Sequence, residues 1–175
     1  MRAEWCSNED LGHLLAALMP ANRLALRVSA ETGLRINDVL SLKTENLSRR
    51  FSVVEQKTGK KRQIYLSQDL YLSLLGMAGR VWVFEHRLDP AKHRTRNAVY
   101  KDLRRAATLF RIDGKMIKAH VSPHSARKIF AVNRFHDTGD LHKVQQLLNH
   151  SNEAVTILYA MADQLTQRHK RKSKP

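Results

Sequence analysis

The sequence has one cysteine, no long apolar run and few acidic residues. The single cysteine, Cys6, excludes an internal disulfide framework and fits a reducing cytosol. No run reaches the roughly 18 apolar residues that a membrane-spanning helix needs. The first ten residues lack the apolar segment of a secretion signal, and we find no repeat, low-complexity segment or internal linker. We therefore expect one globular domain without a membrane role.

The shortage of acids leaves a strong positive charge. The 175 residues include 31 Lys and Arg against 16 Asp and Glu, which gives a formal net charge of +15 and a pI near 10.4. Such a charge on a chain that can form a core (42% hydrophobic residues) favours a polyanionic partner, most often nucleic acid. An anionic membrane is the alternative, but no segment combines a basic face with a Trp, Phe and Leu face.

Hydrophobic periodicity predicts a series of amphipathic helices and one β-hairpin. Gly33 is expected to end the second helix, and Pro20 the first. An apolar stretch at 81–84 predicts a buried connector or strand, and a polar loop follows it. Helices are expected at residues 8–18, 21–32, 35–42, 68–78, 95–110 and behind Pro123, with a β-hairpin formed by 51–56 and 62–66.

Groups capable of phosphodiester chemistry gather downstream of Pro123. His124 and Arg127 are three residues apart, which places both on one helical face, and His150 and Tyr159 follow. An arginine, two histidines and a tyrosine are enough to hold and attack a phosphodiester. Each residue alone also has an ordinary structural explanation. Tyr159 lies among apolar residues, as a core aromatic would, and His150 could close a helix.

Two upstream segments add further cations. Arg35 opens a short helix, where unpaired N–H groups favour anions, and Asp38 is placed one turn on to orient it. A surface ion pair worth under about 1 kcal/mol is the alternative. The hairpin tip could be a solvated turn, or it could reach a groove and offer one lysine to a phosphate. The cations at the tip are Lys57, Lys60, Lys61 and Arg62, and a plausible phosphate-contacting helix face carries Arg96, Lys101, Arg104 and Arg105.

These motifs occur in the order and spacing found in the tyrosine recombinases, or phage integrases. The chain resembles their catalytic domain over about residues 7–165, so we assign 1–165 to that domain and 166–175 to a basic tail. Asn149 stands where the family usually has Gly, and Lys128 where it often has a second histidine. The core-binding domain of most relatives has no counterpart, so we expect an excised fragment or a naturally short member. The matching segments are Thr32-Gly33-Leu34-Arg35-Ile36-Asn37-Asp38, Lys57-Thr58-Gly59-Lys60, Pro123-His124-x-x-Arg127, Leu148-Asn149-His150 and Tyr159.

The resemblance implies an α+β fold that is mainly α-helical with a small antiparallel sheet. It also implies a site-specific DNA recombinase or integrase that uses no metal or other cofactor and forms a 3′-phosphotyrosine intermediate. Tyr159 would be the nucleophile, and Arg35 and Arg127 would clamp the non-bridging oxygens. Lys57 would protonate the leaving 5′ oxygen. His124 would transfer a proton near Tyr159, because a phenol with a pKa of about 10 is protonated at neutral pH. His150 would donate a hydrogen bond to the phosphate.

The same resemblance predicts double-stranded DNA as partner, together with further protomers that assemble on it. It also predicts a cytoplasmic, nucleoid-associated protein of a prokaryote or phage. In relatives the segment after the nucleophile packs on a neighbouring protomer, although a disordered basic arm would also fit. A catalytically silent DNA-binding regulator is the main alternative function. Nine histidines leave a nuclease or zinc protein open, but one cysteine and no carboxylate cluster argue against a metal site. A basic ribosomal-type RNA binder would explain the charge alone.

Overall fold

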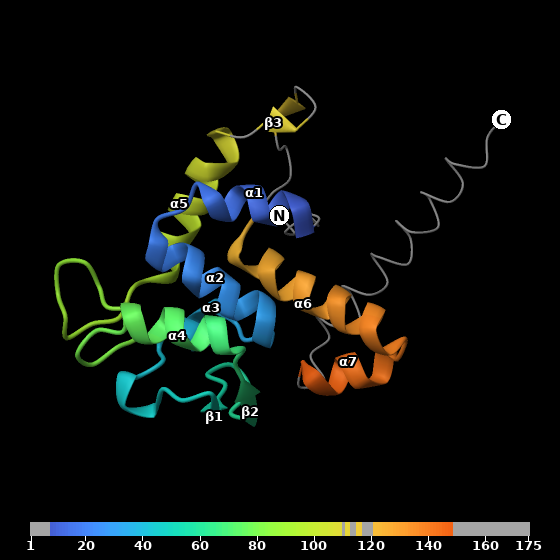
Figure 1. Ribbon diagram of the computed structural model, residues 1–175, viewed down its shortest axis with the longest axis horizontal. Coiled ribbons are helices and arrows are strands. Elements are labelled where there is room, and N and C mark those ends of the chain that lie inside the picture. The colour runs from blue at the N-terminus through green and yellow to red at the C-terminus, as the bar shows by residue number, and fades with distance from the viewer. Residues whose placement is uncertain (1–7, 110, 113–114, 117–120, 149–175) are drawn as a thin grey trace. The chain divides into compact units, whose positions relative to one another are not determined.

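The computed structural model describes residues 8–109, 111–112, 115–116 and 121–148 (Figure 1). The chain divides into two compact units, Met1–Phe130 and Ala131–Pro175. The predicted α+β class, mainly helical with a small antiparallel hairpin, is confirmed. The elements are α1 (Asn8–Ala16), α2 (Pro20–Thr32), α3 (Ile36–Leu40), a 3-10 turn η1 (Thr44–Asn46), β1 (Arg50–Val54), β2 (Lys61–Tyr65), α4 (Gln68–Met77), α5 (Arg96–Leu109), β3 (Arg111–Ile112), β4 (Lys115–Met116), α6 (Pro123–Thr138) and α7 (Leu141–Leu147).

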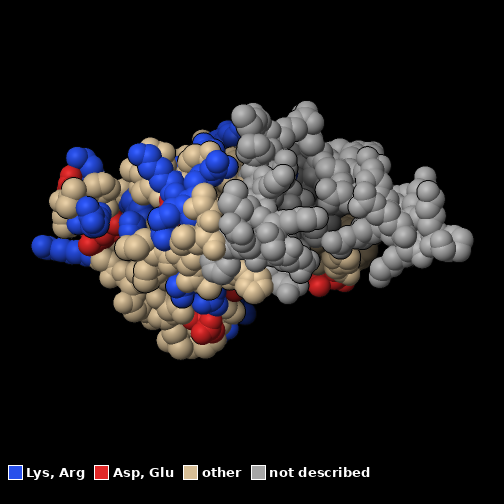
Figure 2. Space-filling view, turned by 90° about the horizontal axis from the view of Figure 1, so that it is seen from above, with Lys and Arg blue, Asp and Glu red and all other residues tan. Residues whose placement is uncertain are grey.

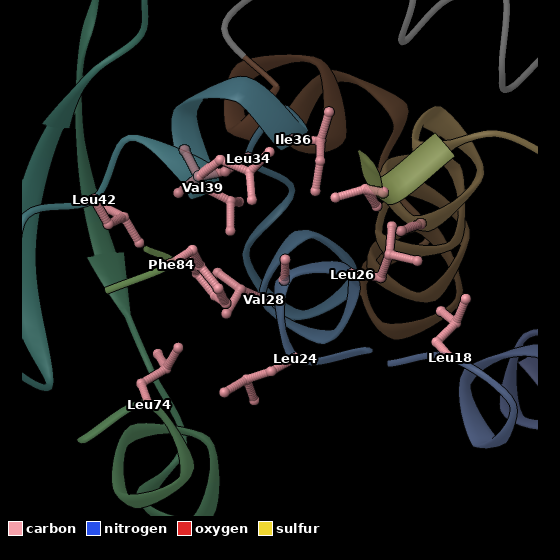
Figure 3. Close-up of a cluster of buried hydrophobic side chains, with 14 of the residues drawn as sticks. Leu18, Leu24, Leu26, Val28, Leu34, Ile36, Val39, Leu42, Leu74 and Phe84 are labelled. Atoms are coloured by element: carbon pink, nitrogen blue, oxygen red, sulfur yellow. The ribbon is translucent and has the colours of Figure 1, made fainter. Parts of the chain in front are cut away.

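Helix α2 is the centre of the first unit. It contacts α1, α3, α4 and α5. Its side chains Leu24, Leu26 and Val28 are buried. Leu24 and Val28 lie on the side of Leu74 of α4 and Phe84 of the connector that follows α4, and Leu26 lies on the side of Leu18 (Figure 3). Pro20 begins this helix instead of ending the previous one, which stops at Ala16. The reason is that proline lacks only an N–H that the first helical turn leaves unpaired in any case.

Gly33 ends α2, as the sequence predicts. Its φ of 71° is left-handed, a conformation that side chains disfavour, and its N–H donates to the Ser29 carbonyl at 2.9 Å. The chain can therefore turn sharply between α2 and α3. Arg35 lies directly after this turn as the N-terminal cap residue of α3.

The hairpin and the buried connector also match the predictions. β1 pairs antiparallel with β2, with Phe51 opposite Ile64, and both of these side chains are buried. In the connector, Val83 and Phe84 are fully buried, and the Val83 N–H donates to the Leu42 carbonyl at 2.9 Å. The short antiparallel pair β3 and β4 was not predicted.

Asp102 of α5 fastens that helix to the start of α2. Its Oδ2 accepts hydrogen bonds from Asn22 Nδ2 at 2.7 Å and from the Met19 N–H at 2.8 Å. Burial acts to raise the pKa of Asp102, but hydrogen bonds from Asn22, Arg105 and Met19 outweigh it and hold the pKa below its usual value. The ionised form is thus the one that this contact stabilises.

The described part of the second unit is a helical hairpin. α6 ends before Gly139, whose φ is 62°, and Asp140 caps α7 by accepting from the N–H groups of His142 and Lys143. His150, Tyr159 and the basic tail lie outside the described residues. None of the described helices is long and apolar enough to cross a membrane.

Candidate active site

Arg35 and Glu55 form a buried ion pair between α3 and the hairpin. Arg35 Nη1 donates to Glu55 Oε2 at 2.6 Å, and the Glu55 side chain is completely buried. Glu55 also accepts from Arg62 Nη1 at 3.1 Å and from the Thr58 hydroxyl at 3.1 Å. One carboxylate therefore joins two arginines to the loop at the hairpin tip.

The carbonyl of Gly33 brings Arg127 to the same place. Arg127 Nη1 of α6 donates a short hydrogen bond to this carbonyl, and the Arg127 residue is only 2% exposed. Arg62 reaches the same carbonyl at 3.5 Å and donates to the Thr32 carbonyl at 2.8 Å. The structure thus gathers the two predicted clamp arginines, Arg35 and Arg127, around one turn.

Asp38 has a different contact from the one expected. The sequence indicated that it would orient Arg35, but Glu55 accepts the hydrogen bond from Arg35 instead. Asp38 Oδ1 accepts from the Gln56 N–H at 2.9 Å, while Oδ2 is buried without a hydrogen-bond partner among the described residues. Burial raises the pKa of Asp38, and the nearby Glu55 charge adds to the effect. The Gln56 hydrogen bond and the charges of Arg35 and Arg127 oppose it.

Lys57 lies at the exposed tip between two residues that are held by carboxylates. Gln56 donates to Asp38, and Thr58 donates to Glu55. The tip closes through the Gly59 N–H, which donates to the Glu55 carbonyl at 2.8 Å. The structure thus fixes the backbone on both sides of the predicted general acid.

His124 lies in the first turn of α6, one turn before Arg127. It is half-buried, and its Nε2 lies 3.5 Å from Arg96 Nη2. Arg96, expected to contact DNA, therefore also lies against a predicted catalytic residue. Of the six predicted catalytic residues, Arg35, Lys57, His124 and Arg127 are described in the first unit, and His150 and Tyr159 lie outside the described residues.

The other predicted DNA contacts differ in how exposed they are and in whether they bond to other groups of the protein. Lys60, Lys61, Lys101 and Arg104 are exposed, and Lys and Arg side chains spread over the described part of the face in Figure 2. Arg105 is also exposed, but its guanidinium donates to Asp102 and to the Ala17 carbonyl. The Arg62 side chain is only 9% exposed because it turns inward to Glu55 and the Gly33 turn. This inward placement differs from that of the exposed lysines at the same hairpin tip, with which Arg62 was grouped from the sequence.

Sequence reasoning missed Glu55, although a signal was present. Phe51 and Val53 alternate along one face of β1, Glu55 follows the end of the strand in the same alternation, and Phe51 is buried. An acid that continues an inward face has to find buried cations. Its partner Arg35 is 20 residues away, and only the fold shows that the two meet.

The sequence and the fold both have known relatives. A family model described as "Phage integrase family" matches residues 4–165. The chain is 29% identical over 143 residues to the "Probable integrase/recombinase YoeC" of Bacillus subtilis (strain 168), covering 78% of this chain and 75% of that protein. It is 31% identical over 172 residues to "Tyrosine recombinase XerD" of Vibrio vulnificus (strain YJ016), covering 87% of this chain and 54% of XerD.

Among solved structures, XerH recombinase bound to its difH substrate before cleavage superposes with a TM-score of 0.66 at 20% identity. The match covers 87% of this chain and 48% of XerH. The chain therefore shares the fold of that recombinase and spans about half the length of XerD and XerH.

Proposed function

The chain belongs to the phage integrase family, and we propose from this that it is the catalytic domain of a tyrosine-type site-specific recombinase. The observation that carries the proposal is the joint placement of Arg35 and Arg127 at the Gly33 turn, beside the hairpin that presents Lys57. Buried guanidinium groups with fixed orientation suit the stabilisation of charge that develops on a phosphate. Most of the predicted chemical groups thus belong to one compact unit.

The proposed reaction exchanges one ester for another. The Tyr159 phenolic oxygen attacks the phosphorus of a DNA phosphodiester, and the bond from phosphorus to the 5′ oxygen breaks. The products are a 3′-phosphotyrosine and a 5′-hydroxyl. Attack by the 5′-hydroxyl of another strand reverses the step, so strands can be rejoined without an external energy source.

The side chains divide the work according to their chemistry. Each guanidinium has five N–H donors, so a hydrogen bond to Glu55 or to the Gly33 carbonyl orients the group for further contacts with phosphate oxygens. Lys57 supplies the proton for the leaving 5′ oxygen, and His124 transfers a proton near Tyr159. His150 donates a hydrogen bond to the phosphate.

Double-stranded DNA is the proposed substrate, and the charge of +15 supports it. Exposed Lys60 and Lys61 at the hairpin tip, with Lys101 and Arg104 on α5, are the proposed phosphate contacts. Further protomers assemble on the DNA, and the basic tail after Tyr159 takes part in that assembly. The protein acts in the cytoplasm at the nucleoid.

Covalent capture of DNA tests the proposal. The protein is incubated with a library of nicked duplexes of randomised sequence, from which the short cleaved fragment diffuses away. A denaturing gel then separates any protein–DNA adduct, and sequencing the adduct yields the preferred site. We expect an adduct with the wild type.

Replacing the nucleophile is the matched control. Tyr159 is the only tyrosine downstream of His124, so Tyr159→Phe should remove the adduct and leave DNA affinity unchanged. An adduct that persists in the Phe variant would show that another residue is the nucleophile. DNA binding without any adduct in the wild type would instead identify a silent regulator with this fold.

A further inference from the structure

Glu55 is a buried acid that the proposed reaction does not itself require. Its side chain has no exposed surface, and a carboxylate in such a place is costly unless cations and donors surround it. Here Arg35, Arg62 and Thr58 all donate to it. An apolar residue would fill the same space without needing these partners, so the carboxylate needs a further explanation.

We propose that Glu55 is a positioning residue for strand cleavage, which fixes the Arg35 clamp and the Lys57 loop to each other. The inference rests on the proposed function, because both groups act there on the same phosphate. Glu55 itself touches neither substrate nor reacting atoms.

The first group of Glu55 contacts holds the clamp residue Arg35. The bond from Arg35 Nη1 to Glu55 Oε2 is 2.6 Å long, and both side chains are at most 9% exposed. Because a guanidinium is planar, a short charge-assisted bond at one nitrogen restricts the direction in which the whole group faces. Glu55 Oε1 is held in turn by Arg62, which also donates to the carbonyls of Thr32 and Gly33 on either side of the turn that leads to Arg35.

The second group of Glu55 contacts holds the loop that contains Lys57. Glu55 Oε2 accepts from the Thr58 hydroxyl, and the Glu55 carbonyl accepts from the N–H groups of Thr58 and Gly59. The Glu55 N–H donates to the Lys60 carbonyl at 3.0 Å. Lys57 therefore lies in a loop whose following residues, Thr58 to Lys60, are all hydrogen-bonded to Glu55. A movement of Glu55 would shift both Arg35 and this loop.

The test uses two chemically modified DNA substrates. Each of them makes cleavage less dependent on one catalytic group of the protein. A 5′-bridging phosphorothiolate has a leaving thiolate that needs no proton, so it dispenses with the general acid. A methylphosphonate at the scissile position lacks one negative charge, so it depends less on the guanidinium clamp. Lys57→Ala and Arg35→Ala serve as reference variants, since each should be rescued by only one of these substrates.

Glu55→Gln keeps the shape of the side chain and removes its charge. We expect single-turnover cleavage of the natural duplex to slow by ~100-fold, the size of effect that a displacement of about 1 Å in a catalytic group produces. Each modified duplex should restore part of the rate, and DNA affinity should stay near that of the wild type. Glu45→Gln is the matched control, because Glu45 is an exposed acid (side chain 68% exposed) paired only at 3.4 Å with Lys43 among the described residues.

Thr58→Val keeps the test decisive if Glu55→Gln does not fold. Thr58 is exposed at the tip, and the change removes a hydroxyl that donates to Glu55 at 3.1 Å and accepts from the Lys60 N–H at 3.4 Å. Its cleavage should be slower and should be rescued by the phosphorothiolate but not by the methylphosphonate. Normal cleavage by Thr58→Val, or equal loss by the Glu55 variant on all three substrates, would overturn the inference. A wild type and Glu45→Gln that form no adduct would instead refute the proposed function, and the inference with it.

Discussion

Gly33 is the position where a single methyl group should disturb fold and site together. Its φ of 71° lies in the left-handed region, and a Cβ placed there would lie 2.5 Å from Phe130 Cδ1 and 2.7 Å from Cε1. Phe130 is a buried ring of α6, so it has little room to move away. Gly33→Ala therefore meets both backbone strain and a steric clash.

The magnitude follows from these two terms. A left-handed backbone costs a non-glycine residue about 1–2 kcal/mol, and overpacking a well-packed core adds about 1–3 kcal/mol. We expect Gly33→Ala to lower the free energy of unfolding by about 2–5 kcal/mol. Because the Gly33 carbonyl accepts from Arg127 and Arg62, any part of the strain that moves the turn should also slow DNA cleavage.

Urea unfolding followed by circular dichroism measures this loss, with an unchanged m-value as the check on the comparison. Gly59→Ala is the matched control. Gly59 also has a positive φ, 66°, but nothing lies within 4 Å of a Cβ added there. Gly59→Ala should therefore lose only the free energy that the left-handed backbone costs, without the cost of a steric clash. Phe130→Leu should relieve the clash, so the double variant Gly33→Ala/Phe130→Leu should be more stable than additivity predicts, by about 1–2 kcal/mol. Equal losses for the two alanine variants, without coupling to Phe130, would refute the reasoning.

Two further predictions concern charged side chains of the same unit. Because the folded state raises the pKa of Asp38, the wild type should lose stability as pH rises through that folded value, whereas Asp38→Asn should not. Melting temperatures should therefore favour the Asn variant at pH 8 and converge towards pH 4; a growing wild-type advantage at high pH would contradict this. Lys61→Ala should weaken DNA binding and reduce the salt slope by ~0.9, as loss of one phosphate contact does, with little change in stability. Arg62→Ala should do the reverse, because its guanidinium is held inside; binding titrations at several salt concentrations and thermal melts distinguish the two.

The local features of the fold were predictable because short sequence patterns determine them. Gly33 ends α2 since only glycine adopts the left-handed turn easily, and the alternation around Phe51 and Ile64 marks the hairpin. Pro20 was assigned to the wrong side of a helix boundary. Proline both ends a preceding helix and starts a following one, so the residue type alone leaves the choice open.

The site was predictable only in part, for a different reason. Motif spacing identified Arg35 and Arg127, but a spacing along the chain does not say which acceptor holds a guanidinium. Glu55 lies 20 residues from Arg35, and the Gly33 carbonyl lies 94 residues from Arg127. A main-chain acceptor has no sequence signature, since every residue has a carbonyl. The inward placement of Arg62 was not predictable for the same reason, because its acceptors are brought near by tertiary structure alone.

Among the residues that the structure describes, the buried charges around the Gly33 turn do not balance, and this imbalance suits an anion. Three guanidinium groups, those of Arg35, Arg62 and Arg127, stand against the carboxylates of Glu55 and Asp38. One positive charge is in excess when Asp38 is ionised, and protonation of Asp38 would increase the excess to two. A phosphodiester has one negative charge and gains a second as a nucleophile adds to phosphorus. In the proposed reaction, a cluster with this excess in a site of low dielectric would stabilise the state reached during cleavage more than the substrate. Glu55 does more than neutralise the cluster, because it fixes the direction of Arg35 and Arg62 without cancelling the charge that the proposed reaction needs.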